Sequence, residues 1–226
     1  MDHPLDNPIY NALNSGNKNL SAGNEFVKYF SKDVSPFAGF KGSTAAGLDQ
    51  LYNMVPSQRT LAVFTPEEIS ISIQWNLINH MNVLQMVYHH PAPNDVTDEE
   101  LIPLEEQHIP AMLSLTKLTN PGPFLQRTIE FGHYEGVFKG NELVAMSGQR
   151  LNPCPYAEIS AVCTHPDHLG NGYASQLLKS QIRRIIAKSE IPFLHVRKDN
   201  TTAIKVYERL GFVNRRDMVI NVIQKY

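Results

Sequence analysis

The chain has 226 residues, of which 42% are hydrophobic, so it is long and apolar enough to form one large domain or two small ones. Its 20 Lys and Arg residues nearly balance its 22 Asp and Glu residues, and this formal charge of −2 excludes a protein that binds nucleic acid through a broad basic surface. Its apolar runs are far shorter than the roughly 18 residues of a membrane-spanning helix, so no contact with a membrane is predicted.

The first region begins with polar residues 1–18, which carry no basic segment followed by an apolar stretch, and a cytoplasmic location is therefore expected. Three later segments have a secondary-structure pattern, namely a helix over 43–54 and strands over 60–64 and 84–88. Residues 65–73 combine a capping box with alternating isoleucines, so helix and strand both remain open there. Two prolines and several turn formers over 90–95 predict a boundary between an N-terminal α/β region, 1–95, and a second domain, 96–226.

The second region has clearer patterns. Its predicted elements, in chain order, are a strand start at 100–103, helices over 109–118 and 124–131, strands over 133–138, 142–151 and 156–164, a helix over 172–188, a strand over 192–196, a helix over 202–210 and a strand over 212–223. The long helix connects two of these strands. Because crossover helices join parallel strands, the strands over 156–164 and 192–196 should be parallel neighbours in a mixed sheet of about six strands.

A glycine loop, Leu169-Gly170-Asn171-Gly172-Tyr173-Ala174, lies between a predicted strand and a predicted helix. Small residues let the backbone approach an anion, and the N–H groups of the loop and of the first helical turn point at it, so a pyrophosphate fits this position. Gly-x-Gly alone is also typical of a tight turn. Two other features support the pyrophosphate interpretation. One is the segment from Asn200 to Phe212, which reads Asn-Thr-Thr-Ala-Ile-Lys-Val-Tyr-Glu-Arg-Leu-Gly-Phe, and the other is a carboxylate, Glu158, on the preceding strand.

Together these segments resemble the GNAT superfamily of acyl-CoA-dependent N-acyltransferases, and more closely its glycine N-acyltransferase-like branch. The resemblance covers about residues 99–226 and rests on three motifs, at 162–166, 170–174 and 200–212. It implies an α/β (α+β) fold with a mixed central sheet, two parallel strands that splay apart and flanking helices, preceded by a smaller α/β region over 1–95 that is a truncated copy of the same fold. The family usually has Arg or Gln where this chain has Leu169, so weaker contacts to the pyrophosphate are expected.

The resemblance implies acetyl-CoA as the co-substrate. Residues expected to contact it lie on the strand, the glycine loop and the third motif: Val162, Cys163, Thr164, Leu169, Gly170, Asn171, Gly172, Tyr173, Ala174, Asn200, Ala203 and Tyr207. Asn200 should also cap the following helix, as asparagine does at a strand-to-helix junction. The two cysteines, Cys154 and Cys163, form neither a disulfide framework nor a metal motif, so no metal is expected.

Acetyl transfer to an amine requires a neutral amine and a proton for the departing thiolate. Glu158 is the candidate base, because a central strand with apolar neighbours would raise its pKa toward neutrality. The alternatives are that Glu158 faces solvent or forms a salt bridge, and that His165 or His195 is the base. Tyr207 is a half-buried or core aromatic from periodicity alone, and the resemblance makes its phenol the acid for the coenzyme A thiolate.

The sequence therefore predicts an N-acetyltransferase that moves an acetyl group from acetyl-CoA to a primary amine of a small molecule or peptide, as a monomer or homodimer. Direct attack in a ternary complex is favoured over a covalent route through Cys163, because a lone strand cysteine without a histidine partner is usually a small buried hydrophobe. A catalytically silent module that binds or senses acyl-CoA is the main alternative, and a protein-interaction domain on the same sheet is a third.

Overall fold

The computed structural model describes residues 3–94 and 100–226, and the predicted boundary at residue 95 lies outside the described residues. The α-helices are α1 (Pro8–Asn14), α2 (Thr44–Met54), α3 (Ile109–Thr119), α4 (Tyr173–Ala187) and α5 (Thr201–Leu210). The strands are β1 (Ser21–Gly23), β2 (Val27–Phe30), β3 (Ala38–Phe40), β4 (Thr60–Thr65), β5 (Trp75–Tyr88), β6 (Ile102–Pro103), β7 (Glu135–Lys139), β8 (Glu142–Gln149), β9 (Tyr156–Thr164), β10 (Ile191–Arg197) and β11 (Phe212–Lys225).

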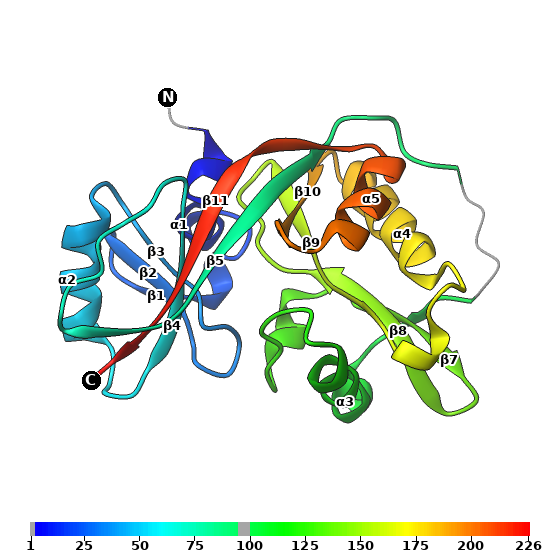
Figure 1. Ribbon diagram of the computed structural model, residues 1–226, viewed down its shortest axis with the longest axis horizontal. Coiled ribbons are helices and arrows are strands. Elements are labelled where there is room, and N and C mark those ends of the chain that lie inside the picture. Colours follow the sequence, from blue (N-terminus) through cyan, green and yellow to red (C-terminus); the bar gives the residue numbers. More distant parts are fainter. Residues whose placement is uncertain (1–2, 95–99) are drawn as a thin grey trace.

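One mixed sheet of eight strands dominates the described residues, in the order β4-β11-β5-β10-β9-β8-β7-β6. Its pairs are antiparallel except for β9 with β10. The long strands β5 and β11 pair along their length and connect the part of the molecule that carries α1 and α2 with the part that carries α4 and α5 (Figure 1). Six strands come from the second region, as predicted, while β4 and β5 come from the first, so strands from both regions share one sheet.

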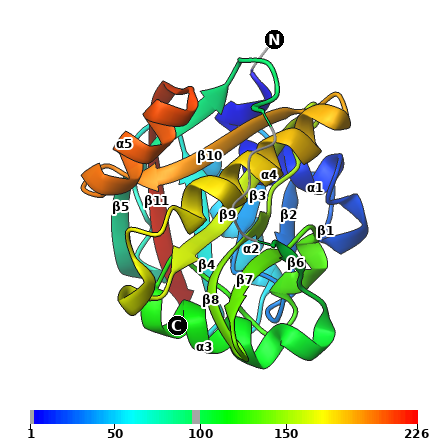
Figure 2. The ribbon, with the colours of Figure 1, turned by 90° about the vertical axis from the view of Figure 1, so that its right-hand side faces the viewer.

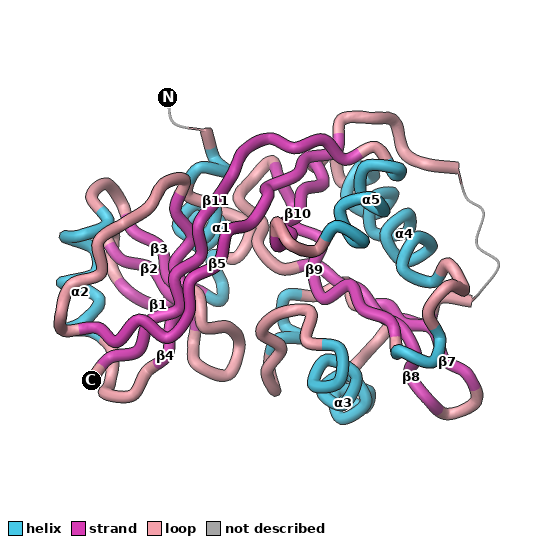
Figure 3. Tube along the Cα trace, in the orientation of Figure 1, coloured by secondary structure: helices cyan, strands magenta, loops and turns pink. Residues whose placement is uncertain are grey.

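Helices cover both faces of this sheet (Figure 3). On one face, α4 lies across β8, β9 and β10, and α5 lies beside it against β11 (Figure 2). Leu178, Ile182 and Ile185 of α4 are fully buried in the core on this face. On the other face, the N-terminal segment with α1 packs on β5, β10 and β11, and α3 packs on β8 and β9. The amphipathic pattern of the sequence determines which face of α4 is buried, since its charged side chains point away from the core.

The parallel strands β9 and β10 separate after a short pairing. Their register begins at Tyr156 with Ile191 and ends at Glu158 with Phe193, beyond which β10 pairs only with β5 on its other side. We call the Glu158–Phe193 pair the apex. Beyond it, β9 carries a bulge against β8, where Ala161 has a left-handed φ of 54°. The predicted parallel, splayed pair is thus confirmed.

One expectation about local structure is wrong. The predicted helix over 124–131 is a 3₁₀ turn at Thr128–Phe131 only, because the Thr128 hydroxyl accepts from the Leu125 N–H and donates to the Val34 carbonyl, fixing the segment to the first region. The strand predicted over 84–88 is confirmed, and it is the end of the much longer β5. In the segment 65–73, left open between helix and strand, Thr65 ends β4 and residues 66–73 form neither. No helix within 3–94 and 100–226 has the length and apolar character needed to cross a membrane.

Candidate active site

Glu158 lies at the apex with its side chain fully buried. Its carboxylate receives hydrogen bonds from Arg150 Nε at 2.9 Å and Nη2 at 2.6 Å, from His195 Nδ1 at 2.7 Å, and a longer one from the Leu151 N–H at 3.4 Å. A carboxylate accepts about four hydrogen bonds. Every acceptor position of Glu158 is therefore occupied by a group of the protein itself.

These contacts reverse the expected titration of Glu158. Burial alone raises the pKa of this carboxyl, but the positive charge of Arg150 and the hydrogen bonds from Arg150 and His195 outweigh it and hold the pKa at about 2. The expectation of a pKa near neutrality is therefore wrong, and the alternative of a salt bridge is what the structure contains. Whether Glu158 accepts a proton during the reaction stays a prediction.

Aromatic residues from the first region cover this ion pair. The guanidinium of Arg150 lies 4.7 Å from the ring centre of Phe37 and 5.9 Å from that of Phe64. Phe64 also packs edge-on against His195, with 5.1 Å between ring centres. These cation–π and edge contacts shield the pair from water, so the first region forms part of the wall around the apex.

A hydrogen-bond chain leads from the apex to the N-terminal segment. His195 Nε2 lies 3.1 Å from Gln85 Nε2, and Gln85 Oε1 accepts from Arg215 Nη1 at 2.7 Å. Arg215 and Arg216 both donate to Asp6, at 2.7 and 2.8 Å. Sequence reasoning named His195 as an alternative base but missed Gln85, Arg215, Arg216, Asp6 and Arg150, although a lone amide inside the apolar run 83–88 is a usable signal for Gln85.

The glycine loop has the geometry of an anion-binding turn. Gly170 and Gly172 have left-handed φ values of 84° and 76°, which favour glycine, and α4 begins directly after Gly172. A Cβ at Gly170 would meet no atom within 4 Å, so the backbone there is open to a ligand. Leu169 is 67% exposed and Tyr173 is buried, while Asn171 donates to the His168 carbonyl at 3.0 Å.

The predicted cofactor residues fit an acyl-CoA. Beyond the apex, Val162, Cys163 and Thr164 lie on a stretch of β9 that no longer pairs with β10. Val162 joins Ala203 and Tyr207 of α5 in one apolar cluster. The expected cap is confirmed, since Asn200 Oδ1 accepts from the Ala203 N–H at 3.1 Å. A backbone edge, an apolar wall and the glycine loop therefore follow one another, as a pantetheine arm and its pyrophosphate require.

Tyr207 and Glu158 lie on opposite faces of the sheet. Ala157 and Ile159 belong to the apolar cluster that contains Tyr207, and alternation along β9 directs Glu158 to the other side. The Tyr207 ring centre is 6.1 Å from that of Phe212. Burial raises the pKa of this phenol to about 12, so it keeps its proton at neutral pH.

The contacts of Cys163 and His165 are those of side chains that stabilise the fold. Cys163 is buried beside α3, and burial raises the pKa of its thiol to about 11, which leaves almost no thiolate at neutral pH. His165 Nδ1 accepts from the Asp167 N–H at 3.2 Å and caps the turn at Pro166–His168. Within 3–94 and 100–226, no group of three or more His, Cys, Asp or Glu side chains is arranged to hold a metal ion.

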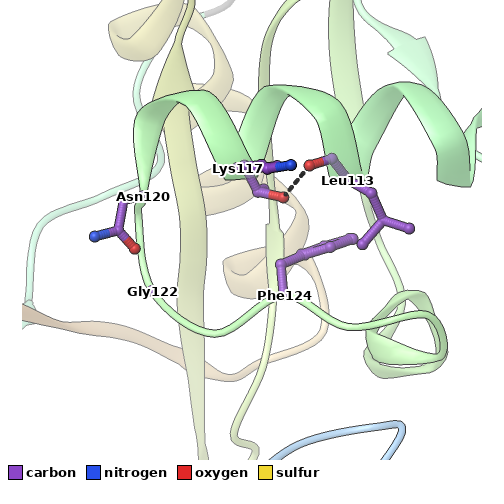
Figure 4. Close-up of a pocket in the computed structure, with 6 residues that line it drawn as sticks. Leu113, Lys117, Asn120, Gly122 and Phe124 are labelled. Atoms are coloured by element: carbon purple, nitrogen blue, oxygen red, sulfur yellow. Dashed lines mark hydrogen bonds between the residues drawn. The ribbon is translucent and has the colours of Figure 1, made fainter.

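Two recesses lie outside the residues predicted for catalysis and for the cofactor. The first, of about 330 Å³, is formed by the end of α3 and the following loop, and is lined by Leu113, Thr116, Lys117, Asn120, Gly122 and Phe124 (Figure 4). The second, of about 150 Å³, is mostly polar and includes Arg150 and Ala157, which flank the apex, together with Gly16 and Asn17 of the first region. Neither contains a residue predicted for catalysis or for the cofactor.

Comparison with known proteins places this geometry in a family. Over its whole length the chain matches a protein from Novosphingobium aromaticivorans DSM 12444, assigned to the acetyltransferases of the GNAT family, with 30% identity, a TM-score of 0.92 and complete coverage of both chains. The chain belongs to the GNAT family. A family model described as FR47-like protein also matches residues 134–220 of this GNAT protein.

Two further matches are more distant. A mycothiol acetyltransferase from Saccharopolyspora erythraea is 34% identical over 82 residues, which is 36% of this chain and 27% of that protein, so the chain spans about a quarter of that relative. A GCN5-related N-acetyltransferase from Kribbella flavida shares the fold at 12% identity, with a TM-score of 0.61 and coverage of 96% and 95% of the two chains. Together with the full-length match, these findings confirm the predicted fold and membership of a family of acetyltransferases that use acetyl-CoA.

Proposed function

We propose that this GNAT protein acetylates a primary amine of a small molecule or peptide by direct attack on acetyl-CoA in a ternary complex. The observation that carries the proposal is the separation of parallel strands β9 and β10 at the apex, followed by an open glycine loop at the start of α4. Backbone groups of β9 beyond the apex would pair with the pantetheine arm. The N–H groups of Gly170–Ala174 would hold the pyrophosphate.

In this reaction the amine nitrogen attacks the thioester carbonyl carbon, a C–N bond forms and the C–S bond breaks. Coenzyme A leaves as a thiolate, which takes the phenolic proton of Tyr207. Burial keeps Tyr207 protonated until that step, and the phenolate then recovers a proton from water. The attacking amine loses its extra proton to a base or to solvent.

The contacts of Glu158 favour a fixed charge over proton acceptance. Four donors surround the carboxylate, it has no exposed surface, and its pKa of about 2 makes it a weak base at neutral pH. In this role Glu158 orients Arg150 and His195 beside the apex, and the amine proton passes to water. Proton acceptance by Glu158 itself is the competing assignment, which the pH profile of its glutamine variant distinguishes.

The first region has a proposed part in acceptor binding. We infer that residues 1–95 form a truncated GNAT-like unit that covers the acceptor side, in the manner of the glycine N-acyltransferase-like branch. The support is that Phe37 and Phe64 cover the guanidinium of Arg150, and that Gln85 reaches His195. The first region would then restrict the path by which an acceptor reaches β9.

A screen of amino acids, polyamines, aminoglycosides and peptide N-termini with acetyl-CoA tests the proposal through the release of free thiol. Amine-dependent thiol release, together with the acetylated amine in the mass spectrum, is the expected result. Binding of acetyl-CoA in a calorimeter without turnover of any amine would instead support a silent acyl-CoA-binding module. Absence of both binding and turnover would support a protein-interaction domain.

A further inference from the structure

The hydrogen-bond chain that ends at Glu158 has a defined direction. An arginine side chain only donates, so Gln85 Oε1, which lies 2.7 Å from Arg215 Nη1, must be the accepting atom of the amide. Gln85 Nε2 therefore supplies both amide protons, one to the Leu5 carbonyl at 2.8 Å and one to His195 Nε2 at 3.1 Å. Arg215 thus determines which way the amide of Gln85 is turned.

This direction determines the tautomer of His195. Because Nε2 of the ring accepts a hydrogen bond from Gln85, it carries no proton of its own, and the ring proton of neutral His195 sits on Nδ1. Nδ1 then donates to the carboxylate of Glu158 at 2.7 Å. A ring with the opposite tautomer would place two N–H groups against each other at Gln85 and two lone pairs at Glu158, which is unfavourable in a buried site.

The chain connects elements that meet at the apex. Gln85 is on β5, His195 on β10 and Glu158 on β9, while Leu5 and Asp6 belong to the N-terminal segment. Gln85 has no exposed surface and the His195 side chain is 2% exposed, so water cannot replace a lost partner without rearrangement. Arg215 is 20% exposed and paired with Asp6 at its outer end, and it connects the buried amide to the surface.

We propose that Gln85 is a positioning residue for acetyl transfer: oriented by Arg215 and Asp6, it fixes the Nδ1–H tautomer of His195 and thereby the place of the Glu158 carboxylate at the apex. The link to catalysis rests on the proposed function, whereas the tautomer does not depend on it. Positioning of this kind matters because a misplacement of about 1 Å near a reacting group costs about 100-fold in rate.

Two neighbouring arginines provide a matched pair of variants. Arg215→Met removes the donor to Gln85 and one ion pair with Asp6, whereas Arg216→Met removes only an ion pair with Asp6. Both side chains are partly exposed, so both variants should fold. Long-range ¹H–¹⁵N spectra of labelled imidazoles report which ring nitrogen carries the proton, and the signals of His195 are assigned by their loss in His195→Gln.

In the parent and in Arg216→Met we expect a single Nδ1–H tautomer of His195, and in Arg215→Met a mixture or the opposite tautomer. The kcat for the best amine should fall about 10- to 100-fold in Arg215→Met with the KM for acetyl-CoA unchanged, and stay within about twofold in Arg216→Met. Arg215→Lys, which keeps a donor, should restore both readouts in part.

An Nε2–H tautomer in the parent would overturn the proposal, as would an Arg215→Met variant with the tautomer and kcat of Arg216→Met. If the parent acetylates no amine, the proposed function fails, but the spectra still decide the tautomer and its dependence on Arg215.

Discussion

Replacement of Glu158 by glutamine separates a fixed charge from a proton acceptor. The pKa of this carboxyl falls from an ordinary 4.5 to about 2 in the folded protein, and at 1.36 kcal/mol per unit this corresponds to about 3 kcal/mol of stability at pH 7. Glu158→Gln keeps the shape but leaves the guanidinium of Arg150 without a counter-ion. We therefore expect the free energy of unfolding at pH 7 to fall by about 3 kcal/mol, within the range for a broken buried ion pair.

The pH dependence of that loss follows from its direction. A carboxyl with a lowered folded pKa stabilises the protein above its unfolded pKa, and the stabilisation disappears as the pH falls through the folded value. Between pH 7 and pH 3 the difference between the parent and Glu158→Gln should shrink by about 2 kcal/mol. Urea unfolding at several pH values measures it, with Glu208→Gln on the exposed side of α5 as the control, for which no such difference is expected.

The same variant tests whether Glu158 is the base of the reaction. If Glu158 acts as a fixed charge, the acidic limb of kcat against pH keeps its midpoint in Glu158→Gln even though the rate is lower. If it is the base, the rate falls about 10²- to 10⁴-fold and the acidic limb disappears. A limb near neutral pH in the parent that is lost in Glu158→Gln would refute the reasoning, because a carboxyl with a pKa of about 2 cannot produce it.

Four further variants test the proposed site. Gly172→Val should weaken coenzyme A binding in a calorimeter more than Leu169→Ala. A β-branched residue is strained at a φ of 76°, whereas removal of the exposed Leu169 side chain introduces no strain. Equally mild effects of the two variants would argue against this loop as the binding site. Tyr207→Phe should lower kcat more than it raises KM, since only the proton for the thiolate is lost, and full activity would remove the acid role. Cys163→Ala should keep kcat within about threefold, and complete loss of turnover with acetyl-CoA binding intact would point to a covalent route.

Local patterns in the sequence were sufficient to predict most helices and strands of the second region. The boundaries of β9 agree with the apolar run at 156–164, and α4 begins directly after Gly172, where the left-handed backbone ends the loop. Asn200 caps α5 as its position at a strand-to-helix junction predicts. These features depend on neighbouring residues, and short-range chemistry is what a single sequence records best.

The buried surroundings of Glu158 were not predictable in the same way. Apolar neighbours along β9 correctly indicated burial, but burial raises a carboxyl pKa only when no counter-ion is present. The counter-ion, Arg150, directly follows the neighbouring strand β8, and His195 lies on β10. Residues 75–83 of the long strand β5 were not predicted as a strand, because their asparagines and histidine interrupt the apolar pattern. This part of β5 is held in the sheet by its pairing with β11.

The position of β5 determines how far the first region can be separated from the second. Strand β5 lies between β10 and β11 and pairs with both, so a chain shortened to residues 100–226 would lose the middle of its sheet. It would also expose the apolar side chains of β10 and β11 that pack on α1, such as Phe193 and Met218. We expect the shortened chain to lack a cooperative unfolding transition by circular dichroism and to bind no acetyl-CoA, whereas the full chain shows both. A shortened chain that unfolds cooperatively and binds acetyl-CoA would show that β10 and β11 pair directly without β5. In that case the first region would be a covering unit that the fold of the second does not require.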